Sequence, residues 1–277
     1  MSKTARYVMY AVISIICLFA IFAGVYAEVF KSAEPENVVL IGNETPGQIE
    51  TQQEVKDVFK KSFNSKLNAE EYTLSKVTKL DETKPLVYTA INLDKQVEEN
   101  YKISVRIPII NIKGTVVEEY NKQTDKIVQM INNIITKTDD NYTICDVTYT
   151  SYINNKVLSV AIMIVVKEGD NTQRTYIQTY NYNLETNKNV EITDVLKSRD
   201  LDQTAVNQKI ISVVKKAAEE AKSVMESGYD VFKRNLEDEM YDVKNVKTFI
   251  QGPEGELYII YAYGNTKTTS EMDIIKI

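Results

Sequence analysis

The residues of this chain that could carry out acid–base chemistry are its carboxylates. The densest sets are Asp139–Asp140, Glu191 with Asp194, and the run Glu237–Glu239. A glycoside hydrolase needs two carboxyl groups about 5–10 Å apart, one of them often with a raised pKa. Each set also has a structural interpretation, as a turn before a strand, a cap of a short helical turn at Asp194, and a solvated face. We therefore expect no catalytic residues, and a glycan hydrolase is the alternative.

The chain contains no histidine and two cysteines, Cys17 and Cys145. Without histidine, Ser-His-Asp catalysis, Cys-His catalysis and the usual zinc ligand sets other than all-Cys or carboxylate sets are excluded. Cys145 follows Ile144, which favours a small buried hydrophobic side chain over a nucleophile. The turn Glu168–Asn171 lacks the alternating acids of a calcium loop. The sequence therefore predicts neither a metal nor a cofactor.

Tyrosine is the second residue type that could carry a function. Tyr176, Tyr180 and Tyr182 alternate along one predicted strand, in the segment TYIQTYNYNL. A row of tyrosines can stack on sugars or anchor a protein interface, and it can equally fill a half-buried sheet face. Both interpretations stay open. If one stretch binds a partner, we expect these three tyrosines to make the contact.

The segment Thr179–Leu196, TYNYNLETNKNVEITDVL, combines this strand with a turn. The letters ETNK form the turn, in which Asn187 is suited to a positive φ because asparagine tolerates that region better than most residues. Val190 and Ile192 are then expected to resume a strand. Asp194 is interpreted as a cap.

An apolar segment near the N-terminus decides the expected compartment. Tyr7–Ala27 is a run of 21 residues without a charge. As a helix it would span about 30 Å, which matches the hydrocarbon core of a bilayer. Lys3 and Arg6 precede it, which keeps residues 1–6 in the cytoplasm and places the body outside the cell. A cleaved signal peptide, with Val25–Ala27 as the cleavage motif, is the alternative and would release a secreted protein.

The rest of the chain reads as a linker followed by one α+β region. Residues 28–53 contain scattered prolines, glycines and acids and form the expected linker, and residues 54–277 form the folded region. Alternating apolar residues predict strands, with the first clear one stopped by Pro108, and helical spacing predicts two long amphipathic helices. The predicted helices are 54–67, 117–136 and 201–225; hairpin turns are expected at 154–155, 168–171 and 252–256. We expect a mostly antiparallel sheet with the two long helices covering one face.

The charge balance limits the classes of partner. The net charge is −6, and Lys3 and Arg6 are the only charged residues among the first 27, so the body is more acidic still. An acidic body argues against nucleic-acid binding, which needs a basic face. It is compatible with a cationic protein partner.

Several segments together resemble a known family. They are NYKISVRIPII, the helix with INNII, YINNKVLSVAIMI, RTYIQTYNYNLETNKNVEITDVL, and the closing FIQGPEGELYIIYAYG and SEMDIIKI. Over about residues 100–277 they are similar to the extracytoplasmic region of the lysozyme-sensing anti-sigma factors of Gram-positive bacteria. The same paired domains occur in the non-catalytic part of a membrane-anchored peptidoglycan deacetylase. The family usually has a glycine in the turn that holds Asn187 here.

The resemblance implies a membrane-tethered binding module of the cell envelope. In the sensors this region binds lysozyme, a basic protein, so a lysozyme-like protein or peptidoglycan is the expected ligand. The sensors carry a cytoplasmic sigma-binding segment where this chain has MSKTAR, and the deacetylase carries a catalytic domain with His and Asp ligands. Neither of those activities is therefore expected. An accessory subunit of a membrane complex is a further alternative.

Overall fold

The structure is a computed structural model that describes residues 59, 62–63, 77–136, 141–226, 232–263 and 271–277. All of these lie in residues 45–277, the second of two units into which the chain divides. The predicted membrane segment Tyr7–Ala27 and the predicted linker lie outside the described residues. In the part of the chain that is described, no helix is long and apolar enough to cross a membrane.

The larger sheet has six strands. In spatial order they are β1 (Val87–Val97), β2 (Tyr101–Ile110), β3 (Thr143–Asn154), β4 (Val157–Glu168), β5 (Arg174–Asn183) and β6 (Lys188–Asn189). All neighbours pair antiparallel except β2 and β3, which are parallel. Parallel neighbours need a crossover, and α3 (Thr115–Thr136) provides it. The β3–β4 hairpin turns at Asn155 and Lys156, whose φ angles of 45° and 67° are those of a two-residue hairpin turn.

The smaller sheet has three antiparallel strands, β7 (Phe249–Gln251), β8 (Leu257–Tyr263) and β9 (Glu271–Lys276). The remaining elements are the helices α4 (Ile192–Ser198) and α5 (Gln203–Glu226), and the short 3₁₀ helices η2 (Glu239–Tyr241) and η3 (Val243–Asn245). The predicted α+β class with mostly antiparallel strands is confirmed, as are the predicted strands other than the one through Ile192, the hairpins at β3–β4 and β7–β8, and both long helices.

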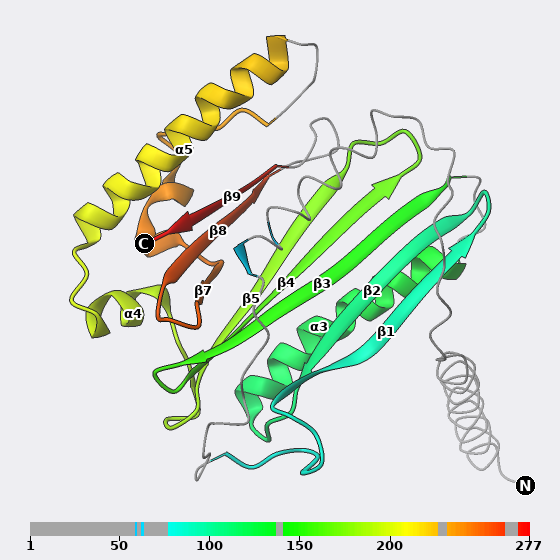
Figure 1. Ribbon diagram of the computed structural model, residues 1–277, viewed down its shortest axis with the longest axis horizontal. Helices are drawn as coiled ribbons and strands as arrows, with labels where there is room; N and C mark the ends of the chain where they lie inside the picture. The colour runs from blue at the N-terminus through cyan, green and yellow to red at the C-terminus, as the bar shows by residue number, and fades with distance from the viewer. Residues whose placement is uncertain (1–58, 60–61, 64–76, 137–140, 227–231, 264–270) are drawn as a thin grey trace, which may run out of the picture. The chain divides into compact units, whose positions relative to one another are not determined.

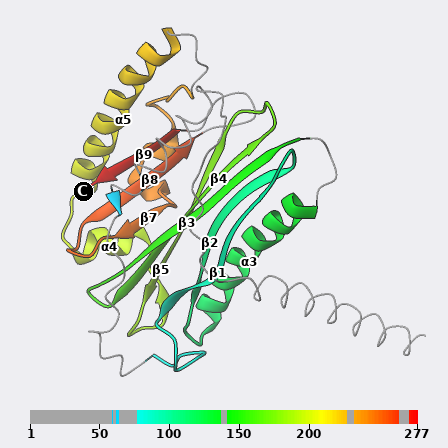
Figure 2. The same ribbon diagram turned by 45° about the vertical axis from the view of Figure 1, so that its right-hand side comes forward.

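Three buried clusters show how these elements are layered. The first joins α3 to one face of the six-stranded sheet. The second joins the opposite face of that sheet to one face of the three-stranded sheet, with Phe59 and Phe63 included. The third joins the far face of the three-stranded sheet to α4, α5, η2 and η3. Figures 1 and 2 show the resulting order of layers: α3, the large sheet, the small sheet, and then α5.

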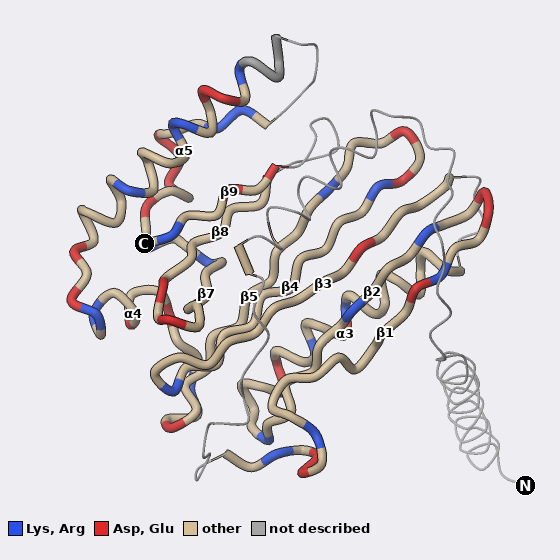
Figure 3. The backbone as a smooth tube through the Cα atoms, in the orientation of Figure 1, with Lys and Arg blue, Asp and Glu red and all other residues tan. Residues whose placement is uncertain are grey.

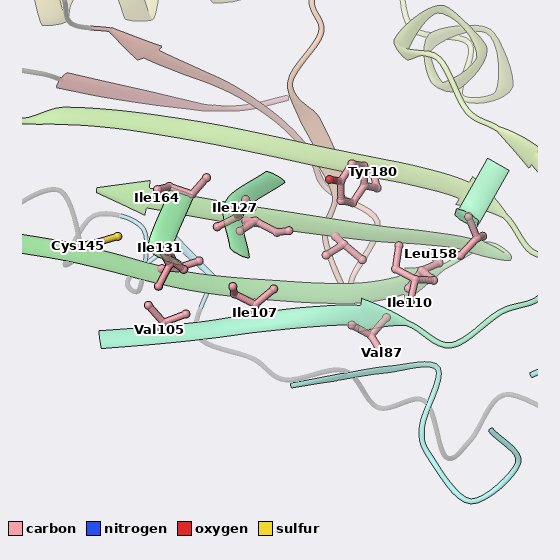
Figure 4. Close-up of a cluster of buried hydrophobic side chains, with 14 of the residues drawn as sticks. Val87, Val105, Ile107, Ile110, Ile127, Ile131, Cys145, Leu158, Ile164 and Tyr180 are labelled. Carbon is pink, nitrogen blue, oxygen red and sulfur yellow. The ribbon is translucent and has the colours of Figure 1, made fainter. Parts of the chain in front are cut away.

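The strand β4 lies at the centre of this arrangement. Figure 4 shows Ile127 and Ile131 of α3 pointing toward Val105 and Ile107 of β2 and toward Ile164 of β4. The alternate residues of β4 point the other way and are buried against the small sheet. Every residue from Val157 to Val166 is therefore buried. The unbroken apolar run VAIMIVV matches this environment, because a strand covered on both faces has no polar side.

The structure corrects the predicted placement of the helices. We expected the two long helices to cover one face of one sheet, but α3 covers the large sheet and α5 covers the small one. The sequences of α3 and α5 both place apolar residues along one side of the helix and polar residues along the other, so both predict an amphipathic helix. Helical periodicity identifies an apolar stripe without identifying the face on which it packs.

Two local boundaries are also corrected. The strand β2 does not stop at Pro108 but continues to Ile110. Pro108 lies beyond the residues that pair with β3 and opposite the irregularity between Thr89 and Ile91, and proline is tolerated at such positions. After the turn, β6 has only two residues, and Ile192 begins α4 instead of continuing a strand.

Candidate functional site

The three tyrosines selected from the sequence divide between core and surface. Tyr180 and Tyr182 are 4% and 1% exposed, whereas Tyr176 is 45% exposed. The ring of Tyr180 stacks on Tyr120 of α3 with centroids 4.6 Å apart, and its hydroxyl lies 3.2 Å from the hydroxyl of Thr124. Tyr180 and Tyr182 therefore belong to the core beneath α3, and their predicted role as contact residues is corrected.

Tyr182 also accounts for the residue found in the following turn, Asn187. Its buried hydroxyl donates to Oδ1 of Asn187 at 3.0 Å. Asn187 has a φ of 56°, as expected for this turn. The asparagine therefore does two things that glycine could not do together: it tolerates the left-handed region and supplies an acceptor to a buried phenol.

Tyr176 remains available for a partner and lies near one end of the large sheet. The strand register pairs Tyr101 with Thr143, and Thr143 with Glu168, so the start of β2, the start of β3 and the end of β4 are level. The β1–β2 and β4–β5 turns therefore project from the same end. Three strand spacings separate them, or about 14 Å.

Backbone hydrogen bonds hold this end of the sheet together. The N–H of Thr143 donates to the carbonyl of Asn100 at 2.9 Å, and the N–H of Gly169 donates to the carbonyl of Tyr142 at 2.8 Å. These bonds join the β1–β2 turn, the segment before β3 and the β4–β5 turn. The three connections are thus fixed relative to one another and can present a defined surface.

The charge on this surface is acidic. Glu98, Glu99 and Asp170 are exposed at the two turns, and Figure 3 shows acidic positions at both tips. In the described part of the chain none of the three has an ion-pair partner. Nearby bases are engaged: Arg174 pairs with Glu168, and Lys167 donates to the carbonyl of Asn171. We call Tyr176, Glu98, Glu99 and Asp170 the acidic end.

The carboxylates selected from the sequence have structural roles where they are described. Oδ2 of Asp194 accepts from the backbone N–H of Glu191 at 3.0 Å, so its capping role is confirmed, but Glu191 is the N-cap residue and Asp194 is the third residue of α4. Glu237, Asp238 and Glu239 are exposed, and Asp238 caps η2 by accepting from the N–H of Met240. Asp139–Asp140 lies outside the described residues.

The most strongly perturbed charged groups were missed by the sequence analysis. Arg234, with a side chain only 4% exposed, donates from Nε and Nη2 to the two carboxylate oxygens of Asp273, both at 2.8 Å. Its Nη1 forms an ion pair with Glu271. Tyr263 donates from its hydroxyl to Asp273 at 2.9 Å and accepts from Tyr241 at 3.2 Å. We call this group the Arg234 cluster.

Electrostatics in the Arg234 cluster follow from burial. Burial alone would lower the pKa of Arg234, but Asp273 and Glu271 raise it above its usual range, so it stays charged. Burial raises the pKa of Tyr263, and the charge of Asp273 raises it further. Arg234 precedes Glu271 by 37 positions and Asp273 by 39, so no local pattern connects them. The segment SEMDIIKI, which contains both acids, has the alternation of an ordinary strand with one polar face.

In the described ranges, no group of three or more His, Cys, Asp or Glu side chains is placed to hold a metal ion. In the Arg234 cluster, the position between the two carboxylates that a metal ion would occupy is taken by the guanidinium of Arg234, which pairs with both of them. Cys145 is buried, as the sequence predicted.

No protein-family model and no curated protein matches the chain. Similar solved structures include a DUF3298 family protein from Pseudomonas aeruginosa PAO1, with a TM-score of 0.36 and 11% identity over 70% of this chain and 91% of that one. A DUF3298 member from Bacteroides fragilis NCTC 9343 gives a TM-score of 0.31 and 11% identity over 64% of this chain and 80% of that one. Neither score carries an argument about function.

Proposed function

We propose that the protein is a non-catalytic, membrane-tethered binding module of the Gram-positive cell envelope, with its body outside the cell. The proposal is supported by the uncharged run Tyr7–Ala27 behind Lys3 and Arg6, and by the family resemblance over about residues 100–277. Under this proposal residues 28–53 are a linker between the membrane and the folded region.

The observation that carries the binding role is the acidic end. It combines an exposed aromatic side chain, Tyr176, with carboxylates that have no ion-pair partner among the described residues, on two turns held by backbone hydrogen bonds. Tyrosine is enriched among the residues that dominate binding energy at interfaces. Exposed carboxylates accelerate the encounter with a cationic surface. The partner that fits this chemistry best is a basic protein such as a lysozyme, which is also the ligand implied by the resemblance.

A hydrolase with paired carboxylates has less support. Asp194 is a cap, and Glu271 and Asp273 are both held by Arg234. Asp273 accepts two hydrogen bonds from Arg234 and a third from Tyr263, so it is not free to serve as the second carboxylate that glycan hydrolysis requires. Release of muropeptides from cell-wall sacculi by the purified protein, abolished by one Asp or Glu to Ala change that leaves the fold intact, would favour the hydrolase and defeat the binding proposal.

The proposal is tested by binding of the full chain, purified in detergent, to a basic lysozyme. The double variant Glu98→Gln with Glu99→Gln should weaken binding at least fivefold, and Tyr176→Ala should weaken it by about 1 kcal/mol or more. Binding should also weaken with added salt, since the charges are exposed. The matched control is Glu118→Gln with Glu119→Gln, an adjacent exposed pair on α3, which should bind as the wild type does.

Retention on sacculi without retention on lysozyme would replace the basic protein by peptidoglycan as the ligand. Stable co-purification with another membrane protein, without binding to either, would favour the accessory subunit. Equal losses in the two double variants would show that net charge, and not the acidic end, governs binding.

A further inference from the structure

The Arg234 cluster has two carboxylates and one guanidinium, and the two carboxylates are bound unequally. Asp273 receives two aligned hydrogen bonds from Arg234 and a third from Tyr263. Glu271 contacts Nη1 of Arg234 as an ion pair, without the paired and aligned geometry of the two bonds to Asp273. Asp273 and Arg234 therefore neutralise each other, and Glu271 adds an uncompensated negative charge.

The surroundings of Glu271 penalise that charge. The groups that interact with it are Arg234, from the segment before η2, and Asp273, from its own strand. Burial raises the pKa of Glu271, Arg234 lowers it, and the like charge of Asp273 raises it, with the result above the ordinary value. Its side chain is nevertheless 23% exposed, so protons can reach it without unfolding.

The cluster joins segments that are far apart in the sequence. Arg234 lies over the ring of Tyr263 at 4.9 Å, and Phe232 stacks on that ring with centroids 4.9 Å apart. Tyr241 of η2 donates to the hydroxyl of Tyr263. The cluster is therefore the attachment of residues 232–241 to β8 and β9.

We propose that the Arg234 cluster is an acid-strengthened latch, in which a proton on Glu271 tightens the attachment of residues 232–241 to β8 and β9. The proton removes the uncompensated charge and leaves a balanced pair of Arg234 and Asp273. The inference stands on the cluster alone and does not depend on the proposed function.

A second glutamate, Glu256 in the turn between β7 and β8, has the opposite shift of its pKa. Glu256 has a side chain 16% exposed and pairs with Lys276, and among the described residues no other carboxylate pairs with that lysine. Burial raises its pKa, but hydrogen bonds from the backbone and from Lys276 outweigh burial and bring the pKa below the ordinary value. The two glutamates therefore predict pH effects of opposite sign.

The direction of each effect follows from proton linkage. For Glu271 the folded state binds the proton more tightly than the unfolded chain, so its contribution is present at low pH and is lost as the pH rises through the folded pKa. For Glu256 the contribution is present at neutral pH and is lost as the pH falls through its lowered pKa.

The test is urea unfolding of the full chain in detergent at several pH values from 4 to 7, with circular dichroism used to monitor the transition. Glu271→Gln carries no charge at any pH and mimics the protonated latch. The ratio of its unfolding equilibrium constant to that of the wild type should be at least about threefold smaller at pH 7 than at pH 4, because the wild type loses the contribution of the protonated Glu271 as the pH rises. For Glu256→Gln the same ratio should be larger at pH 7 than at pH 4, and the stability of the variant should approach that of the wild type only in acid.

A difference between Glu271→Gln and the wild type that is constant with pH, or that grows toward acid, would overturn the latch. If the Gln variant does not fold, the carboxyl carbon of Glu271 can be titrated by NMR in the wild type. A midpoint at or below that of an ordinary glutamate would overturn it equally. Asp273→Asn should weaken the fold at every pH, since it removes the negative charge and one of the two oxygen atoms that accept from the guanidinium.

Discussion

At the scale of single residues, a side chain can serve a backbone conformation and a buried partner together. Asn187 sits at a position where the backbone favours glycine, yet its side chain accepts from the hydroxyl of Tyr182, which is 1% exposed. An unpaired buried hydroxyl costs about 1–3 kcal/mol, and asparagine is one of the few residues other than glycine that adopt the left-handed region readily. The hydrogen bond therefore accounts for asparagine here.

The role of Asn187 predicts a result contrary to the usual gain from glycine in such a turn. Asn187→Gly should lower the free energy of unfolding by about 1 kcal/mol, because Tyr182 loses its acceptor. In the background of Tyr182→Phe the same change should be neutral or stabilising. Urea unfolding of the four proteins gives the coupling energy, and stabilisation by Asn187→Gly in both backgrounds would contradict the explanation.

At the scale of elements, β7 is a strand of three residues whose outer edge is closed by side chains of the large sheet. The amide of Asn181 donates to the carbonyl of Phe249 at 2.8 Å, and the N–H of Gln251 donates to the hydroxyl of Ser159 at 3.1 Å. Ser159 in turn donates to Asn181 at 2.6 Å. The two sheets are thus joined by polar bonds as well as by the apolar cluster between them.

This junction predicts a large effect from one polar side chain. Asn181→Ala should lower the free energy of unfolding by about 2–3 kcal/mol, because the carbonyl of Phe249 and the hydroxyl of Ser159 both lose a buried partner. Asn92→Ala, at an exposed position of β1, is the matched control and should change it by less than about 0.5 kcal/mol. Equal effects of the two changes would show that the junction adds nothing to stability.

The elements could be predicted from the sequence, whereas their contacts could not. Alternation in β2, the apolar stripe of α5 and the turn at Asn155 are local signals, and each led to the right element. The meeting of Asn181 with Phe249, and of Arg234 with Asp273, depends on which faces pack together. The apolar run of β4 did signal burial on both faces, but not the identity of the second sheet.

The candidate site was predictable in part for the same reason. A row of alternating tyrosines was recognised, but the packing of α3 decides which of them are covered. Only Tyr176 stayed exposed, and the level turns that surround it follow from the parallel pairing of β2 with β3. Parallel pairing through a helical crossover joins segments too distant for any local pattern to indicate.

At the scale of the whole molecule, the position of β4 makes it a reporter of complete unfolding. Its amides pair with β3 on one side and β5 on the other, and its side chains are covered by both neighbouring layers. Hydrogen exchange at Ile162 should therefore require opening of the entire fold, with an exchange free energy equal to that of global unfolding. Amides of β1, which has one pairing neighbour among the described strands, should exchange at a lower free energy. The chain has no tryptophan to serve as a fluorescent reporter of unfolding, but the amides of β4 can report global stability through hydrogen exchange.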